Sequence, residues 1–115
     1  MARLSTHILD TANGIPGSGV AVKLYSLRGE RHLVASAVTN RDGRTDAPLL
    51  GDETFVAGQY ELEFAMGDYF RKLGVPLAEP AFLDQVVIRV ALKDDQNYHV
   101  PLLASPWSYT TYRGS

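Results

Sequence analysis

Residues 58–74, Gly-Gln-Tyr-Glu-Leu-Glu-Phe-Ala-Met-Gly-Asp-Tyr-Phe-Arg-Lys-Leu-Gly, change their hydrophobic period halfway along. The first half alternates apolar and polar side chains, which is typical of a strand with one buried face. The apolar side chains that share this face are Tyr60, Leu62 and Phe64. The second half spaces its apolar side chains as a helix does, with Asp68 as a candidate N-terminal cap. The stretch therefore predicts a strand over 58–64 and one short helix over 68–73.

Short apolar segments separated by turn residues continue this pattern along the rest of the chain. The sequence contains 10 Gly and 6 Pro, which is enough to break it into many short strands. The further segments predicted as strands are 4–10, 20–25, 32–39, 44–47, 84–92, 98–103 and 107–112, and 13–19 is predicted as a loop. This number of strands favours an all-β protein, an antiparallel β-sandwich with one short helix.

Length and composition exclude several classes of protein. A chain of 115 residues predicts a single domain over residues 1–115, and the absence of cysteine excludes disulfides and thiolate metal sites. The formal charge of −2 argues against a nucleic-acid partner, and no apolar run is long enough to cross a membrane. With no signal peptide at the start and no peroxisomal signal at the C-terminus, we expect a cytoplasmic protein.

Three histidines are candidates for proton transfer near neutral pH. By strand alternation, His7 would share a face of the first strand with Ser5 and Leu9. His99 would share a face of a late strand with Pro101 and Leu103. His32 follows a turn and has no evident polar company. Spacing alone leaves each of them open as an ordinary strand histidine. No short histidine spacing typical of zinc enzymes is present, so we expect no metal site.

Arg44 directly follows the Asp42-Gly43 turn. It is either a solvated turn residue or a fork that binds a planar, carbonyl-rich or anionic ligand at two points. The chain ends in an aromatic, strand-like run rather than a polar tail, which indicates a packed terminus.

Motifs along the whole chain point to one family. The most specific is the terminal Tyr-Arg-Gly-Ser, residues 112–115, preceded by Asn-Tyr-His-Val-Pro-Leu-Leu-Ala-Ser-Pro at 97–106. Leu-Ser-Thr-His-Ile-Leu-Asp at 4–10 and Asp-Gly-Arg at 42–44 agree with it, as does Gly-Gln-Tyr at 58–60. In this order the motifs resemble those of the 5-hydroxyisourate hydrolases, the transthyretin-related enzymes of urate breakdown.

The resemblance implies a transthyretin-like sandwich of two four-stranded sheets and a homotetramer with active sites in a channel between dimers. It implies hydrolysis of 5-hydroxyisourate to 2-oxo-4-hydroxy-4-carboxy-5-ureidoimidazoline, with no cofactor and no metal. The alternative within the same fold is a non-enzymatic carrier of small ligands of the thyroid-hormone type. A carrier would need an apolar slot and no proton-transfer groups. A sandwich for adhesion or sugar binding would explain the fold but none of the motif residues.

The resemblance also implies a set of functional residues. Those implied as catalytic are His7, Arg44, His99 and Ser115, and those implied to bind substrate are His7, Arg44, Tyr112 and Arg113. For Arg113 a structural role near the chain end is the alternative. The sequence departs from the family pattern at Asn97, where the family often has a further histidine, and this change could alter the tuning of His99.

Overall fold

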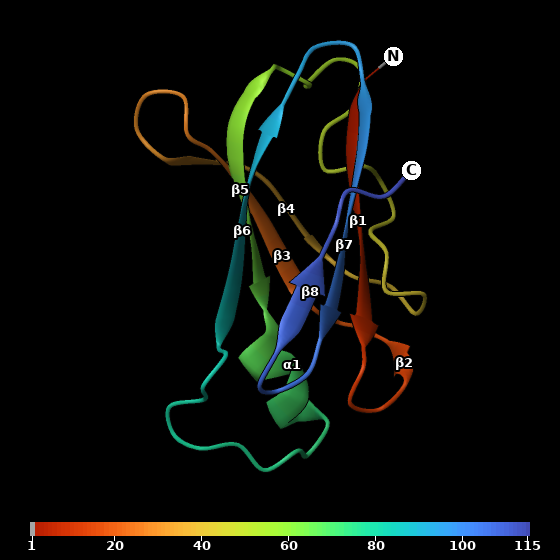
Figure 1. Ribbon diagram of the computed structural model, residues 1–115, viewed down its shortest axis with the longest axis vertical. Coiled ribbons are helices and arrows are strands. Elements are labelled where there is room, and N and C mark those ends of the chain that lie inside the picture. Colours follow the sequence, from red (N-terminus) through yellow and green to blue (C-terminus); the bar gives the residue numbers. More distant parts are fainter. Residues whose placement is uncertain (1) are drawn as a thin grey trace.

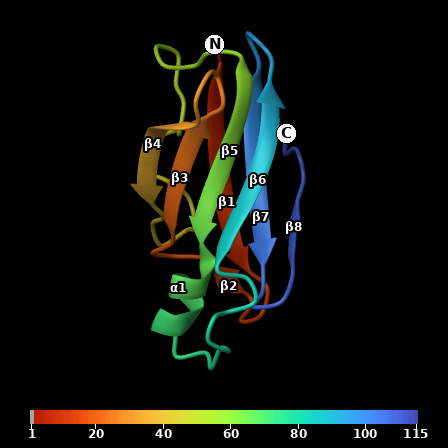
Figure 2. The same ribbon diagram turned by 90° about the vertical axis from the view of Figure 1, so that its left-hand side faces the viewer.

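The computed structural model describes residues 2–115, which form two four-stranded sheets and one short helix. One sheet has the order β2-β1-β7-β8 and contains β1 (Arg3–Asp10), β2 (Ile15–Pro16), β7 (Asn97–Ala104) and β8 (Tyr109–Thr111). The other has the order β4-β3-β5-β6 and contains β3 (Ala21–Ser26), β4 (His32–Val38), β5 (Gly58–Ala65) and β6 (Gln85–Leu92). Figures 1 and 2 show the two sheets as stacked layers, with the helix α1 (Met66–Lys72) at the end where β5 finishes. The predicted all-β sandwich with one short helix is confirmed.

The core lies between the two sheets and follows the predicted alternation. On β5 the buried side chains are Tyr60, Leu62 and Phe64, as the sequence indicated. On β1 every second side chain is buried, from Leu4 to Asp10, and those between them are only partly covered. Each fully buried aliphatic or aromatic side chain stabilises such a core by about 1.5–3 kcal/mol. The outward face of β1, which carries Ser5 and His7, is therefore available for other roles.

The sheets are not entirely antiparallel, which corrects one part of the prediction. β1 and β7 run parallel, so that Ser5 lies opposite His99 and His7 opposite Pro101. The alternation of apolar side chains reports which face of a strand is buried, but it carries no information on the direction of the neighbouring strand. These two strands lie near opposite ends of the chain, so no short turn fixes how they pair.

The helix begins at Met66, earlier than predicted, and Asp68 lies in its first turn rather than at its cap. The N-cap position is Ala65, which makes no side-chain capping bond. Instead, the backbone N–H of Gly67 donates to the carbonyl of Asp84 at 2.9 Å, which satisfies one of the free donors of the first turn. No helix within residues 2–115 combines the length and apolar character needed to span a membrane.

The predicted edge strand over 44–47 does not form, although this segment does run beside β1. Isolated bridges join Arg44 to His7 and Leu50 to Leu4, and between them the chain turns away. A local hydrogen bond from Thr45 Oγ1 to the carbonyl of Ala47, at 2.5 Å, accompanies this departure. Ser, Thr and Asx side chains that bond locally in this way compete with strand pairing.

Two other segments differ from the prediction by more than a one-residue shift of a boundary. The segment predicted as a loop over 13–19 contains the two-residue strand β2, which pairs with the end of β1 through Leu9 and Pro16. The last strand, β8, is shorter than the predicted 107–112, because only its residues 109–111 pair with β7.

Candidate functional site

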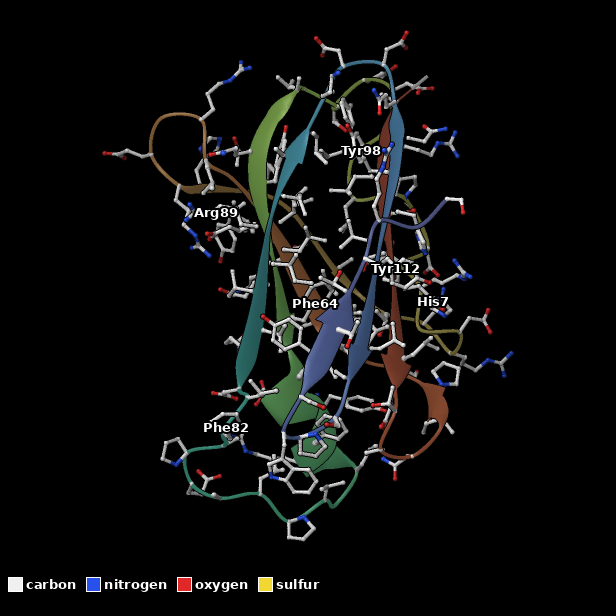
Figure 3. The ribbon with its side chains drawn as sticks, in the orientation of Figure 1. His7, Phe64, Phe82, Arg89, Tyr98 and Tyr112 are labelled. Carbon is white, nitrogen blue, oxygen red and sulfur yellow. The ribbon has the colours of Figure 1, made fainter. Side chains whose placement is uncertain are left out.

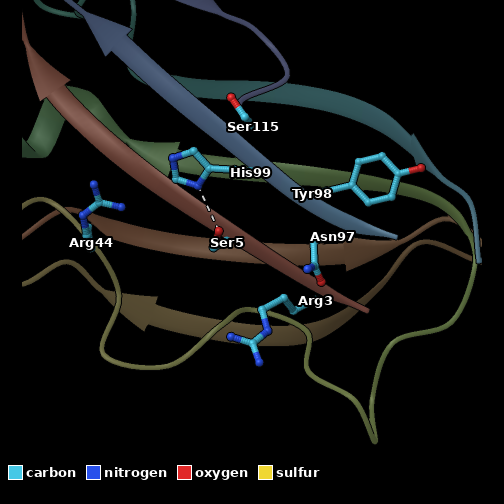
Figure 4. Close-up of a pocket in the computed structure, with 7 residues that line it drawn as sticks. All are labelled: Arg3, Ser5, Arg44, Asn97, Tyr98, His99 and Ser115. Atoms are coloured by element: carbon cyan, nitrogen blue, oxygen red, sulfur yellow. Dashed lines mark hydrogen bonds between the residues drawn. The ribbon is translucent and has the colours of Figure 1, made fainter. Parts of the chain in front are cut away.

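The candidate site lies on the outward face of β1 and β7, on the side of this sheet that faces away from the core. Burial alternates along β1 and over the first four residues of β7, so Ser5, His7 and His99 are partly exposed while their neighbours point inward. A pocket of about 390 Å³ opens on this face. Its lining, drawn in Figure 4, consists of Arg3, Ser5, Arg44, Asn97, Tyr98, His99 and Ser115.

His99 is held by its neighbours on both sides of β7. Its Nδ1 lies 2.9 Å from Ser5 Oγ, and its carbonyl oxygen accepts a hydrogen bond from the backbone N–H of Gly114 at 2.7 Å. Burial lowers the pKa of the imidazole, and the positive charges of Arg44 and His7 lower it further. The ring is therefore neutral near pH 7 and able to accept a proton.

His7 stands beside the pocket, with its ring centroid 6.5 Å from that of His99. Its Nε2 lies 2.8 Å from the carbonyl oxygen of Asp42. Because a carbonyl oxygen only accepts hydrogen bonds, Nε2 must carry the proton, and the neutral ring then has its free lone pair on Nδ1. The backbone of the 40–44 turn thus determines the tautomer of His7.

The 40–44 turn also positions Arg44 at the site. Asn40 Oδ1 accepts from the backbone N–H groups of Asp42 and Arg44, at 2.9 and 3.3 Å. Gly43 has a φ of 77°, and its carbonyl oxygen accepts a hydrogen bond from the backbone N–H of Ile8 at 2.8 Å. A Cβ at position 43 would collide with the carbonyl oxygen of Ile8, so only glycine allows this close approach to β1. No described residue accepts a hydrogen bond from the Arg44 guanidinium, which leaves its N–H groups free for a ligand.

The chain end contributes to the site with only one of its predicted residues. Ser115 lines the pocket beside His99. Arg113 instead lies over the ring of Tyr98, 4.5 Å from its centroid, and donates to Gln96 Oε1 at 3.1 Å. Tyr112, a residue that is 59% exposed, borders a separate cavity of about 320 Å³ together with Arg113.

The structure therefore brings His7, Arg44, His99 and Ser115 together, and it does not bring Tyr112 or Arg113 into the same pocket. Figure 3 shows His7 and Tyr112 on this side of the molecule, on different segments. The pairing of β8 with β7 ends at Thr111, so the residues after it are not placed by the ladder. Alternation along 107–112 therefore could not predict that Tyr112 and Arg113 lie outside the pocket.

Three residues of the lining received no role from the sequence. Arg3 and Ser5 lie at even steps before His7 on β1, so the period of two already placed them on its face. Their position beside β7 depends on the parallel register, which pairs Arg3 with Asn97 and Ser5 with His99. Tyr98 offered no signal, because by alternation it belongs to the opposite face.

The chemistry available here is proton transfer and charge stabilisation. Two imidazoles can exchange protons near neutral pH, and a free guanidinium can bind a carbonyl or an oxyanion through two hydrogen bonds. Within residues 2–115, no three His, Cys, Asp or Glu side chains gather in a way that could hold a metal ion.

The chain is similar to several known proteins over nearly its whole length. A family model described as "HIUase/Transthyretin family" matches residues 4–114. The chain is 55% identical to the 5-hydroxyisourate hydrolase of Pseudomonas aeruginosa, over 100% of this chain and 93% of that protein. Among solved structures, the 5-hydroxyisourate hydrolase of Klebsiella pneumoniae is similar with a TM-score of 0.83 and 35% identity, covering both chains fully. Transthyretin from Sparus aurata is similar with a TM-score of 0.87 and 28% identity, over 97% of this chain and 96% of that one.

Proposed function

Because this chain belongs to the HIUase/Transthyretin family, we propose that it hydrolyses 5-hydroxyisourate to 2-oxo-4-hydroxy-4-carboxy-5-ureidoimidazoline in urate degradation. The observation that carries the proposal is the gathering of two histidines and a free arginine, His7, His99 and Arg44, around one polar pocket. A carrier of thyroid-hormone type would need an apolar slot instead, so the polar lining favours the hydrolase.

The reaction adds one water molecule across a C–N bond of the six-membered ring. A new C–O bond forms at a ring carbonyl carbon, the C–N bond breaks, and the departing nitrogen takes up a proton. One histidine removes a proton from the attacking water and a histidine returns one to the nitrogen, so that the proton count balances. Proton transfer by positioned groups of this kind contributes about 10²–10⁴-fold to a rate.

Arg44 is proposed to bind the carbonyl edge of the substrate and to stabilise the negative charge that develops on its oxygen. A donor aimed at such an oxyanion contributes about 10²–10³-fold. The free guanidinium and its position across from His7 support this role.

The chain end is proposed to complete the substrate site. Ser115, which lines the pocket, would help to orient the ring. For Tyr112 we retain substrate binding as a proposal, although it borders the neighbouring cavity. For Arg113 the contacts with Tyr98 and Gln96 support the structural alternative, because they occupy its guanidinium.

In this scheme the enzyme is a metal-independent cyclic amide hydrolase, since the histidines and Arg44 together supply the proton transfer and the positive charge that the reaction needs.

We further propose that residues 1–115 form a single domain that works as a homotetramer. The pocket lies open on an exposed sheet face, and packing a second copy against that face would enclose it.

The decisive experiment follows the ultraviolet decay of freshly prepared 5-hydroxyisourate with and without the protein. The proposal predicts a decay that accelerates in proportion to enzyme concentration and that is lost in His99→Ala. Decay at the spontaneous rate, combined with saturable binding of an aromatic ligand, would instead identify a carrier.

A further inference from the structure

The His99 ring lies between two cross-strand neighbours, Ser5 and Gly114, which contact opposite edges of the ring. On the β1 side, Ser5 Oγ is 2.9 Å from Nδ1. On the chain-end side, Gly114 forms an isolated bridge with His99, and a Cβ added to Gly114 would lie only 2.7 Å from Cδ2. Both ring atoms next to Cγ are therefore in contact with neighbours, and Figure 4 shows the far end of the ring, with Nε2, turned towards the side of Arg44.

We propose that Ser5 is a positioning residue that fixes the orientation of His99 and, together with the positive charge of Arg44, its tautomer. In this arrangement Nδ1–H donates to Ser5 Oγ, and Nε2 presents its lone pair to the pocket. The kinetic consequence rests on the proposed function of the pocket, whereas the tautomer itself does not.

The orientation follows from what a ring flip would do. Turning the imidazole by half a turn about its Cβ–Cγ bond would exchange Nδ1 for Cδ2, and a C–H group would then face Ser5 Oγ. The hydrogen bond at 2.9 Å would be lost, and a partly buried ring nitrogen would lie against Gly114 without a partner. Loss of such a partner is unfavourable, so the observed orientation is the stable one.

The tautomer follows from the charges around the ring. The charged and titratable groups nearby are His7 and Arg3 on β1, Arg44 after its turn, and the terminal carboxylate of Ser115. Burial and Arg44 keep the ring neutral near pH 7, so only one of its nitrogens carries a proton. A guanidinium on the Nε2 side favours a lone pair there and disfavours an N–H dipole that points at it. The proton is then on Nδ1, where Ser5 Oγ accepts it.

The test measures the tautomer and the kinetics separately. Ring ¹⁵N NMR of the full chain at neutral pH should show His99 protonated at Nδ1 in the wild type, and a shift of the proton towards Nε2 in Ser5→Ala. The matched control is Ser36→Ala, which removes an exposed serine from β4 in the other sheet and should leave the spectrum of His99 unchanged.

In kinetics, Ser5→Ala should lower kcat by about 10-fold, with a smaller change in KM, and Ser5→Thr should restore most of the loss because it returns the hydroxyl. A wild-type ring protonated at Nε2, an unchanged tautomer in Ser5→Ala, or an unchanged kcat in that variant would each overturn the proposal. The NMR measurement needs no substrate. A wild type that does not hydrolyse 5-hydroxyisourate would therefore refute the proposed function, and the role of Ser5 would still be decided by the spectra.

Discussion

His7 and His99 face each other at a ring-centroid distance of 6.5 Å with their planes tilted by 37°. They stand diagonally rather than directly opposite, because the parallel register pairs His99 with Ser5. Each ring therefore has a hydrogen-bond partner of its own, the Asp42 carbonyl for His7 and Ser5 Oγ for His99. The two rings still interact, because the charge of His7 is one of the causes that lower the pKa of His99.

Replacing either histidine of this pair should remove most of the activity. His7→Ala and His99→Ala are each expected to lower kcat/KM by at least about 10²-fold with little change in stability, because both side chains lie on the outward face of their sheet. His32→Ala is the control: His32 is exposed on β4, where its Nδ1 is 2.8 Å from the Glu30 carbonyl oxygen. Circular dichroism and the 5-hydroxyisourate assay measure both effects. A silent His99→Ala alongside an inactive His32→Ala would contradict the site.

The pKa of His99 should lie below 6.5, chiefly because of burial and secondarily because of Arg44. In Arg44→Gln it should rise only partway towards 6.5, because burial remains. Between the lowered pKa and 6.5 the unfolded chain binds more protons than the folded one, so the free energy of unfolding should fall as the pH drops through this window. An NMR titration of the His99 ring in both proteins measures the shift. A pKa that is unchanged or lower in Arg44→Gln would contradict it.

Gly114→Ala should impair turnover by displacing the His99 ring. The added Cβ would lie 2.7 Å from Cδ2, so the ring or the chain end must move. A misplacement of about 1 Å in a catalytic group can lower a rate by about 10²-fold, and we expect a loss of at least 10-fold. Gly51→Ala is the matched control, because nothing lies within 4 Å of its added Cβ. Equal kcat values for the two variants would show that the chain end does not hold the ring.

Tyr69→Phe should destabilise the fold without lowering the activity of the folded enzyme. The Tyr69 hydroxyl donates to the buried carboxylate of Asp10 at 2.8 Å and so joins α1 to β1, on the core side of that strand. Burial and this bond raise the pKa of Tyr69. Removing the donor leaves the carboxylate with its bonds from residues 12 and 13, so we expect a loss of about 1–2 kcal/mol in urea unfolding. Tyr109→Phe, at an exposed site, should stay within about 0.5 kcal/mol of wild type.

Assembly should be required for full activity. The pocket is open on an exposed sheet face, so a second copy packed there would exclude water from it. Sedimentation velocity should show a tetramer at assay concentration, and activity per chain should fall on dilution below the dissociation constant. A fully active monomer would contradict this prediction.

The sequence by itself predicted the parts of the molecule that depend on local pattern. Alternation over 58–64 identified the strand and its buried face, and the change to helical spacing identified the helix, although its start at Met66 was missed. The family motifs at 4–10, 42–44, 97–106 and 112–115 implied a functional role for His7, Arg44, His99 and Ser115. The four residues lie in or beside one pocket, and their roles stay a prediction. The strand and helix predictions succeeded because side-chain periodicity depends on neighbours in the chain.

Only the tertiary structure decided how the distant segments meet. The parallel pairing of β1 with β7 brings Ser5 to His99, and the departure of the chain after β8 sends Arg113 to Tyr98 instead of into the pocket. The segment over 44–47 follows β1 without pairing continuously, so Arg44 comes to the site from a turn and not from an edge strand. Strand direction and register are set by packing between segments far apart in the sequence, and the alternation within a strand is the same for either direction.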